Sequence, residues 1–164
     1  MLTRGRAGWF FVPLLALLFA APAGAEHPSL VGVWRFVSEI DRRQDGTVIE
    51  VAPRDGYVGL IIYTQDGFMS GQMFPRGRTW MPATATLDDL RRTIDLSTSY
   101  FGRYEVDWAA GKVTHKVQGN LDPTGETEAY VRQFKLSGDQ LTLSGTWEYG
   151  GEKLGFEIVW ERAR

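Results

Sequence analysis

The chain has 164 residues, with 18 lysines and arginines against 20 aspartates and glutamates, a formal net charge of −2, and no cysteine. Its length predicts one domain with a sizeable core, and the lack of cysteine excludes disulfides, so packing and hydrogen bonds must hold the fold together. No basic cluster stands out, which disfavours nucleic acid and anionic membranes as partners.

The amino-terminal segment has the composition of a secretory signal peptide. Two arginines precede an apolar run from residue 9 to residue 20, and Ala23 and Ala25 stand at the spacing of a signal-peptidase site. The run is short of the ~20 residues that span a bilayer, so we expect no integral membrane segment after cleavage. We therefore expect a signal peptide at 1–25, a folded domain at 26–164, and a periplasmic or secreted location.

Alternation of apolar and polar residues recurs along most of the remaining chain and predicts short strands joined by tight turns. The alternating segments are residues 32–38, 47–51, 58–63, 68–74, 102–107, 112–117, 130–136, 141–147 and 153–161. In the first of them, Gly32, Trp34, Phe36 and Ser38 fall on one face. Short connections favour an antiparallel meander, and one apolar face per strand favours a sheet curved around its own core. The pattern predicts an all-β, up-and-down antiparallel barrel of about eight to nine strands.

One segment in the middle of the chain breaks this alternation. Leu87, Leu90 and Ile94 recur at helical spacing, and Thr86 is a residue type that caps helices, with two aspartates in the first turn. The spacing predicts one short α-helix from Leu87 to Ser99, placed as a lid or plug at one end of the barrel would be.

The first and last strands carry residues suited to closing the barrel. A Gly32-x-Trp34 motif places a large indole where glycine lets another backbone approach, and Arg162 shares a face with Trp160 at the end of the last strand. If the barrel closes, these strands are neighbours, and Arg162 could lie over Trp34 in a contact worth roughly 0.5–2 kcal/mol. The alternative is that both tryptophans are ordinary core aromatics.

These terminal motifs resemble those of the lipocalin superfamily, and the chain as a whole is similar to the bacterial and fungal lipocalin-like domain family. The similar segments follow one another from residue 30 to residue 163: LVGVWRFVS, LIIYTQDGFMS, YFGRYEVDWAAGKVTHKVQG, RQFKLSGDQLTLS and IVWERA. The resemblance implies a calycin-type, lipocalin-like antiparallel barrel. It implies little about activity.

Several polar side chains are expected on the inner face of the barrel. His115 alternates with valines and should point inward, and the turn before it should bring Tyr104 alongside. An inward Arg132 is costly unless it contacts an acid, a ligand or a carbonyl; alternatively it extends to solvent at the rim. His115 could likewise be a core histidine bonded to a neighbour. The predicted ligand-binding residues are Tyr63, Tyr104, His115, Tyr130 and Arg132.

A polar cluster inside an apolar barrel is typical of a binding site for a small hydrophobic or amphipathic molecule, and non-catalytic binding is our leading hypothesis. Two alternatives stay open. One is an isomerase or cyclase that uses His115 and Tyr104 as acid and base and Arg132 as an anion anchor. The other is a filled structural barrel that acts through its surface. We expect no cofactor, because no nucleophile elbow, phosphate loop or dinucleotide motif is present, and one interior histidine cannot form a metal site.

Overall fold

The computed structural model describes residues 29–78, 83–123 and 129–164, and the predicted signal peptide lies outside these ranges. The described residues form nine strands and one helix. The elements are β1 (Gly32–Arg42), β2 (Val48–Pro53), β3 (Tyr57–Tyr63), β4 (Phe68–Pro75), α1 (Leu87–Asp95), β5 (Thr98–Asp107), β6 (Lys112–Asn120), β7 (Ala129–Ser137), β8 (Gln140–Tyr149) and β9 (Glu152–Arg162).

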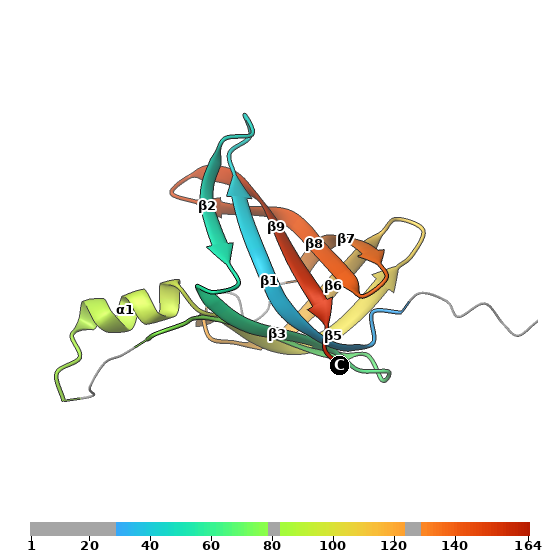
Figure 1. Ribbon diagram of the computed structural model, residues 1–164, viewed down its shortest axis with the longest axis horizontal. Helices are drawn as coiled ribbons and strands as arrows, with labels where there is room; N and C mark the ends of the chain where they lie inside the picture. The colour runs from blue at the N-terminus through green and yellow to red at the C-terminus, as the bar shows by residue number, and fades with distance from the viewer. Residues whose placement is uncertain (1–28, 79–82, 124–128) are drawn as a thin grey trace, which may run out of the picture.

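The strands form one antiparallel sheet that closes on itself. Their hydrogen-bonded order is β2-β1-β3-β4-β5-β6-β7-β8-β9, and β1 also pairs with β9. Eight strands therefore close the barrel, while β2 pairs only with the second half of β1, from Ser38 to Arg42 (Figure 1). The predicted up-and-down barrel is confirmed.

Strand β6 shows how the sequence alternation builds this barrel. Val113 and His115 are fully buried and Val117 is nearly so, whereas Lys112 and Lys116 at alternate positions are exposed. Successive side chains of a strand point to opposite faces, so the apolar set fills the interior while the lysines remain in water. Its neighbour β5 places Tyr104 directly opposite His115, as the turn between them predicts.

One end of the barrel is closed by the two terminal strands. Trp34 on β1 is fully buried and donates its indole N–H to the Leu30 carbonyl at 2.8 Å, while the Arg162 guanidinium carbon lies 4.1 Å from the indole centroid. The same guanidinium donates to the Val31 carbonyl at 2.9 Å. Gly32 has φ +137°, and a β-carbon there would lie 2.7 Å from an Arg162 nitrogen, so glycine is required where the arginine crosses the chain.

A β-bulge in β1 changes which side chains face the interior. The pairing with β9 shifts between Phe36, opposite Trp160, and Ser38, opposite Val159. An extra residue in one strand reverses the alternation beyond it. The prediction that Ser38 continues the face of Trp34 and Phe36 is therefore wrong: inward positions after the bulge belong to Glu39 and Asp41.

Helix α1 begins as predicted and ends earlier. Thr86 accepts a hydrogen bond from the Asp89 N–H, and Asp89 bonds back to the Thr86 N–H, which completes a capping box. The helix ends at Asp95 rather than Ser99, because the chain from Thr98 onward pairs with β4. Tertiary pairing of a β-branched and aromatic segment overrides helical spacing there.

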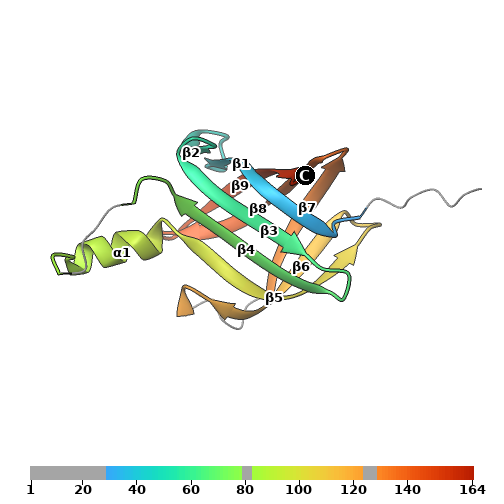
Figure 2. The ribbon, with the colours of Figure 1, turned by 60° about the horizontal axis from the view of Figure 1, so that its bottom comes forward.

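The helix does not plug the barrel. No residue of α1 is buried, Leu87 is 72% exposed, and both views show the helix projecting beyond the barrel beside the ends of β4 and β5 (Figures 1 and 2). Only its carboxyl end approaches the barrel opening, through Asp95 and the following Leu96. Across the described ranges, no helix has the length and apolar character needed to cross a bilayer.

Candidate ligand-binding site

A cavity of about 300 Å³ opens into the barrel at the end opposite Trp34, where the carboxyl end of α1 reaches the rim. Its inner wall is apolar, and Ile61, Leu143 and Trp160 in that wall are each 4% exposed or less. Its outer part includes Asp95, Thr98 and Trp147, of which Trp147 is 40% exposed. The cavity is therefore accessible from solvent and reaches down to the core.

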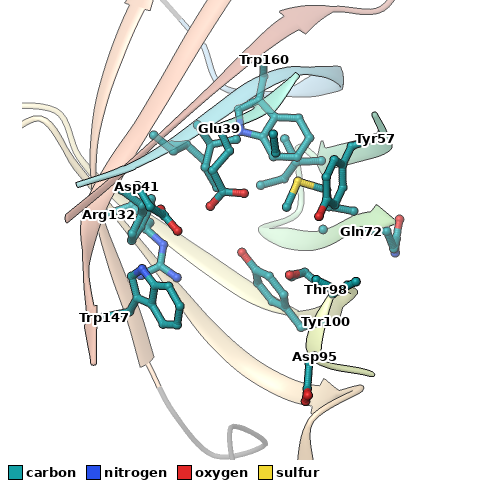
Figure 3. A pocket seen from close by; sticks show the side chains of 18 residues that line it. Glu39, Asp41, Tyr57, Gln72, Asp95, Thr98, Tyr100, Arg132, Trp147 and Trp160 are labelled. Atoms are coloured by element: carbon teal, nitrogen blue, oxygen red, sulfur yellow. The ribbon is translucent and has the colours of Figure 1, made fainter. Parts of the chain in front are cut away.

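Five aromatic rings form much of the cavity lining. They are Tyr57 from β3, Tyr100 from β5, Trp147 from β8, and Phe156 and Trp160 from β9. In Figure 3, Trp160 and Tyr57 lie on one side of the cavity, and Tyr100 and Trp147 lie across from them. Gly71 of β4 also lines the cavity, and a β-carbon there would lie 3.4 Å from the Tyr100 ring, so the glycine lets this ring lie against the strand.

Charged groups also line the cavity, with three carboxylates and one guanidinium. Glu39 and Asp41 project from β1 beyond its bulge, Asp95 stands at the end of α1, and Arg132 projects from β7. Figure 3 shows Asp41 beside Arg132 at one side and the Glu39 carboxylate extending toward the centre. Asp41 is only 6% exposed, whereas Glu39 is half-buried and Asp95 is exposed, so the carboxylates differ in their access to solvent.

Arg132 is held against aromatic rings. Its guanidinium carbon lies 5.0 Å from the Tyr130 ring centroid and 4.8 Å from that of Phe156. Cation–π contacts of this kind stabilise a guanidinium that has left bulk water. The structure places the predicted ligand-binding arginine among the residues that line the cavity, with its side chain half-buried.

The indole N–H of Trp160 is a buried donor. Trp160 is 4% exposed, and its Nε1 has no hydrogen-bond partner among the residues that the structure describes. The ring lines the cavity, and Figure 3 shows the nitrogen on the side that faces Glu39. Buried donors in native proteins are bonded with few exceptions, so this N–H is available to an acceptor on a bound molecule.

Below the cavity, His115 joins two tyrosines into a hydrogen-bonded chain. The Tyr63 hydroxyl lies 2.8 Å from Nε2, and the Tyr100 hydroxyl lies 3.0 Å from Nδ1. Burial, with a further contribution from the charge of Arg132, lowers the pKa of His115 to about 3. A neutral imidazole has one donor and one acceptor nitrogen, so one tyrosine donates to the ring and the other accepts from it.

The same burial keeps both phenols protonated. It raises the pKa of Tyr100 to about 12 and the pKa of Tyr63 well above its usual range. All three groups of the chain are therefore neutral near pH 7, and only Tyr100 lines the cavity. His115 reaches the cavity through that hydroxyl and not directly.

The other predicted site residues occupy two different environments. Tyr104 packs edge-on against Tyr63, with ring centroids 4.8 Å apart, and donates its hydroxyl to the Thr64 carbonyl at 2.8 Å. Tyr130 accepts a hydrogen bond from the Asn120 amide at 2.8 Å. Of the five residues predicted to bind a ligand, the cavity lining contains Arg132 alone, and the other four are not part of it.

The sequence prediction did not identify Tyr100, Glu39 or Asp41. Tyr100 alternates with Tyr104 and could have been found by that signal, but the predicted helix extended to the residue just before it. Glu39 and Asp41 carried no such signal, because they face inward only as a result of the bulge. In the described part of the chain, no group of three or more histidines and carboxylates is arranged to hold a metal ion.

Comparison with family models gives a match over residues 31–163 to the model described as Lipocalin-like domain. The chain belongs to the lipocalin-like domain family. The match spans every strand of the barrel, so the resemblance carried by the terminal motifs extends over the whole fold. None of the curated proteins compared with this lipocalin-like domain matches it.

Proposed function

We propose that this lipocalin-like domain binds a small amphipathic molecule in the cavity at the open end of its barrel. The observation that carries the proposal is the cavity itself, which opens to solvent and combines an apolar inner wall with a few polar groups. Ligand sites in proteins have this composition and range from about 300 to 1,000 Å³. A volume of about 300 Å³ favours a small ligand over a long-chain lipid.

Non-catalytic binding is favoured by the state of His115. Both ring nitrogens are engaged by tyrosines, and a pKa of about 3 leaves the ring neutral near pH 7. An efficient general acid or base has a pKa close to the operating pH, which this ring lacks. We assign His115 a structural role, supporting the Tyr100 ring from below the cavity.

We also propose that the protein is exported. The support is the composition of residues 1–25, with two arginines, an apolar run and the Ala23-x-Ala25 motif. Amino-terminal sequencing of the protein from its own cells tests this. A chain that starts at Glu26 supports export, and a chain that retains the first 25 residues contradicts it.

The binding proposal is tested by narrowing the cavity mouth. Thr98 is an exposed residue of the lining, so Thr98→Trp should obstruct entry with little effect on folding. Thr146→Trp is the matched control, because Thr146 is exposed on β8 and is not part of the lining. The probes are 1-octanol, octanoate and octylammonium, which share one apolar body and differ in head-group charge.

Isothermal titration of the full protein should show one molecule of at least one probe bound. Thr98→Trp should weaken that binding about tenfold or more, equivalent to about 1.4 kcal/mol, and Thr146→Trp should leave it unchanged. Failure of all three probes to bind, or equal binding by Thr98→Trp and wild type, would contradict the proposal.

A further inference from the structure

We propose that the cavity selects a small organic cation, an amine or quaternary ammonium group carried on an apolar body. This inference rests on the proposed function and specifies the charge of its ligand. It follows from the cavity's charges, its aromatic rings and its buried indole donor.

The carboxylates outnumber the basic groups around the cavity. Glu39, Asp41 and Asp95 line it, against a single guanidinium from Arg132. Several carboxylates around a space of about 300 Å³ repel one another, and a cation between them offsets the field of all three.

The position of Arg132 does not offset the excess of carboxylates around the cavity. Its guanidinium lies over the Tyr130 and Phe156 rings, and Figure 3 shows Asp41 beside it. The positive charge is thus surrounded by aromatic faces and a carboxylate at one side of the cavity. Glu39 instead extends toward the centre, where a ligand head group would lie.

The aromatic lining favours the same ligand class. The rings of Tyr57, Tyr100, Trp147 and Trp160 border the cavity, and aromatic faces attract ammonium groups that have left bulk water. Rings combined with carboxylates recognise an organic cation by charge and by apolar contact together. A metal ion would gain little from such rings.

The indole N–H of Trp160 is an independent indication that the cavity receives a ligand. It is buried, lines the cavity and has no partner among the described residues. A donor held in this way needs an acceptor atom, which a ligand with a hydroxyl, ether or carbonyl oxygen would supply.

The β1 bulge explains how the acidic groups come to face a mostly apolar interior. Without the register shift after Phe36, the alternation would turn Ser38 and Ile40 inward in place of Glu39 and Asp41. Placing carboxylates inside a barrel costs folding free energy, and bulges recur beside functional sites, where they redirect side chains. A cationic ligand gives this arrangement a function.

The test uses the same three eight-carbon probes, because they separate charge from apolar contact. Octylammonium should bind the wild-type protein about tenfold or more tightly than 1-octanol, and octanoate should bind most weakly. Glu39→Gln should lower octylammonium affinity about tenfold and leave 1-octanol affinity unchanged. Glu157→Gln is the matched control, because Glu157 is exposed on β9 outside the lining.

Tighter binding of octanoate than of octylammonium would overturn the inference and show that Arg132 governs selection. Equal binding of octylammonium and 1-octanol would also overturn it, as would equal losses of both in Glu39→Gln. Each of these results would leave the proposed binding function standing, since a probe would still occupy the cavity. If Glu39→Gln does not fold, the order of the three probes on the wild-type protein decides alone.

Discussion

The two ends of the barrel are built from the same strands and differ in what fills them. At the closed end, Trp34 is fully buried, its N–H is bonded to the Leu30 carbonyl, and Arg162 covers its ring. At the open end, a cavity of about 300 Å³ is bordered by Glu39, Asp41 and other polar groups. Strand β1 runs through both ends and changes character at its bulge.

The residues of β1 before its bulge serve the stability of the fold, and those after it serve recognition of a ligand. Before the bulge, the inward residues of β1 are Trp34 and Phe36, which bury apolar surface and close the fold. After it, the inward residues are carboxylates, which contribute little to packing and give the cavity its charge. Substitutions at the two ends should therefore affect different measurements.

The largest difference in the free energy of unfolding is expected when a tryptophan is replaced by alanine at each of the two ends. Trp34→Ala should lower the free energy of unfolding by about 3–5 kcal/mol, because it leaves a cavity in the closed end and removes the contact with Arg162. Trp147→Ala should lower it by no more than about 1 kcal/mol, because Trp147 is already 40% exposed. Urea denaturation followed by circular dichroism measures both values.

Equal losses of stability in these two variants would show that the open end supports the fold as much as the closed end does. The proposed division between the two ends of the barrel would then be wrong.

A smaller effect should come from His115, which lies between the two ends. Its pKa is about 3 in the folded protein against an ordinary 6.5. The contribution of this histidine to stability is therefore fully present above pH 6.5. It falls as pH decreases from 6.5 toward 3, because in that range only the unfolded chain takes up the proton. Between pH 7 and pH 5, this group alone should cost the wild-type protein about 2 kcal/mol of unfolding free energy. His115→Gln should lack that part of the decline.

Urea denaturation of both proteins at pH 7 and pH 5 gives the two declines. Exposed carboxylates contribute to both alike, so the difference between the declines isolates the histidine. A decline of the same size in wild type and His115→Gln would mean that the imidazole can take up a proton in the folded protein, and it would reopen an acid–base role.

The sequence was sufficient to predict the barrel and its closure. Strand alternation identified most of the strands, and Gly32, Trp34 and Arg162 at the two ends of the domain indicated which strands meet. These features depend on local pattern and on the closing of a curved sheet, both of which a sequence carries. The polar residues of the interior were harder to place, since facing inward does not distinguish Tyr63, packed in the core, from Tyr100, which borders the cavity.

The bulge sets the main limit on predicting the site from sequence. A single extra residue after Phe36 reverses the faces of the rest of β1, and neither glycine nor proline marks it. Glu39 and Asp41 consequently resemble solvent-facing residues of an ordinary strand. The cavity is also a property of the whole barrel, because its size depends on how side chains from many strands fill the interior.

Whether a small molecule occupies the open end of the barrel can be read from the tryptophan indole N–H resonances. In a ¹⁵N-correlated NMR spectrum of the full protein, assigned by single Trp→Phe variants, the tightest-binding eight-carbon probe is added to saturation. A ligand at the open end should shift the Trp147 and Trp160 signals and leave the Trp34 signal in place. A shift of Trp34 with no change at Trp147 and Trp160 would contradict binding at that end.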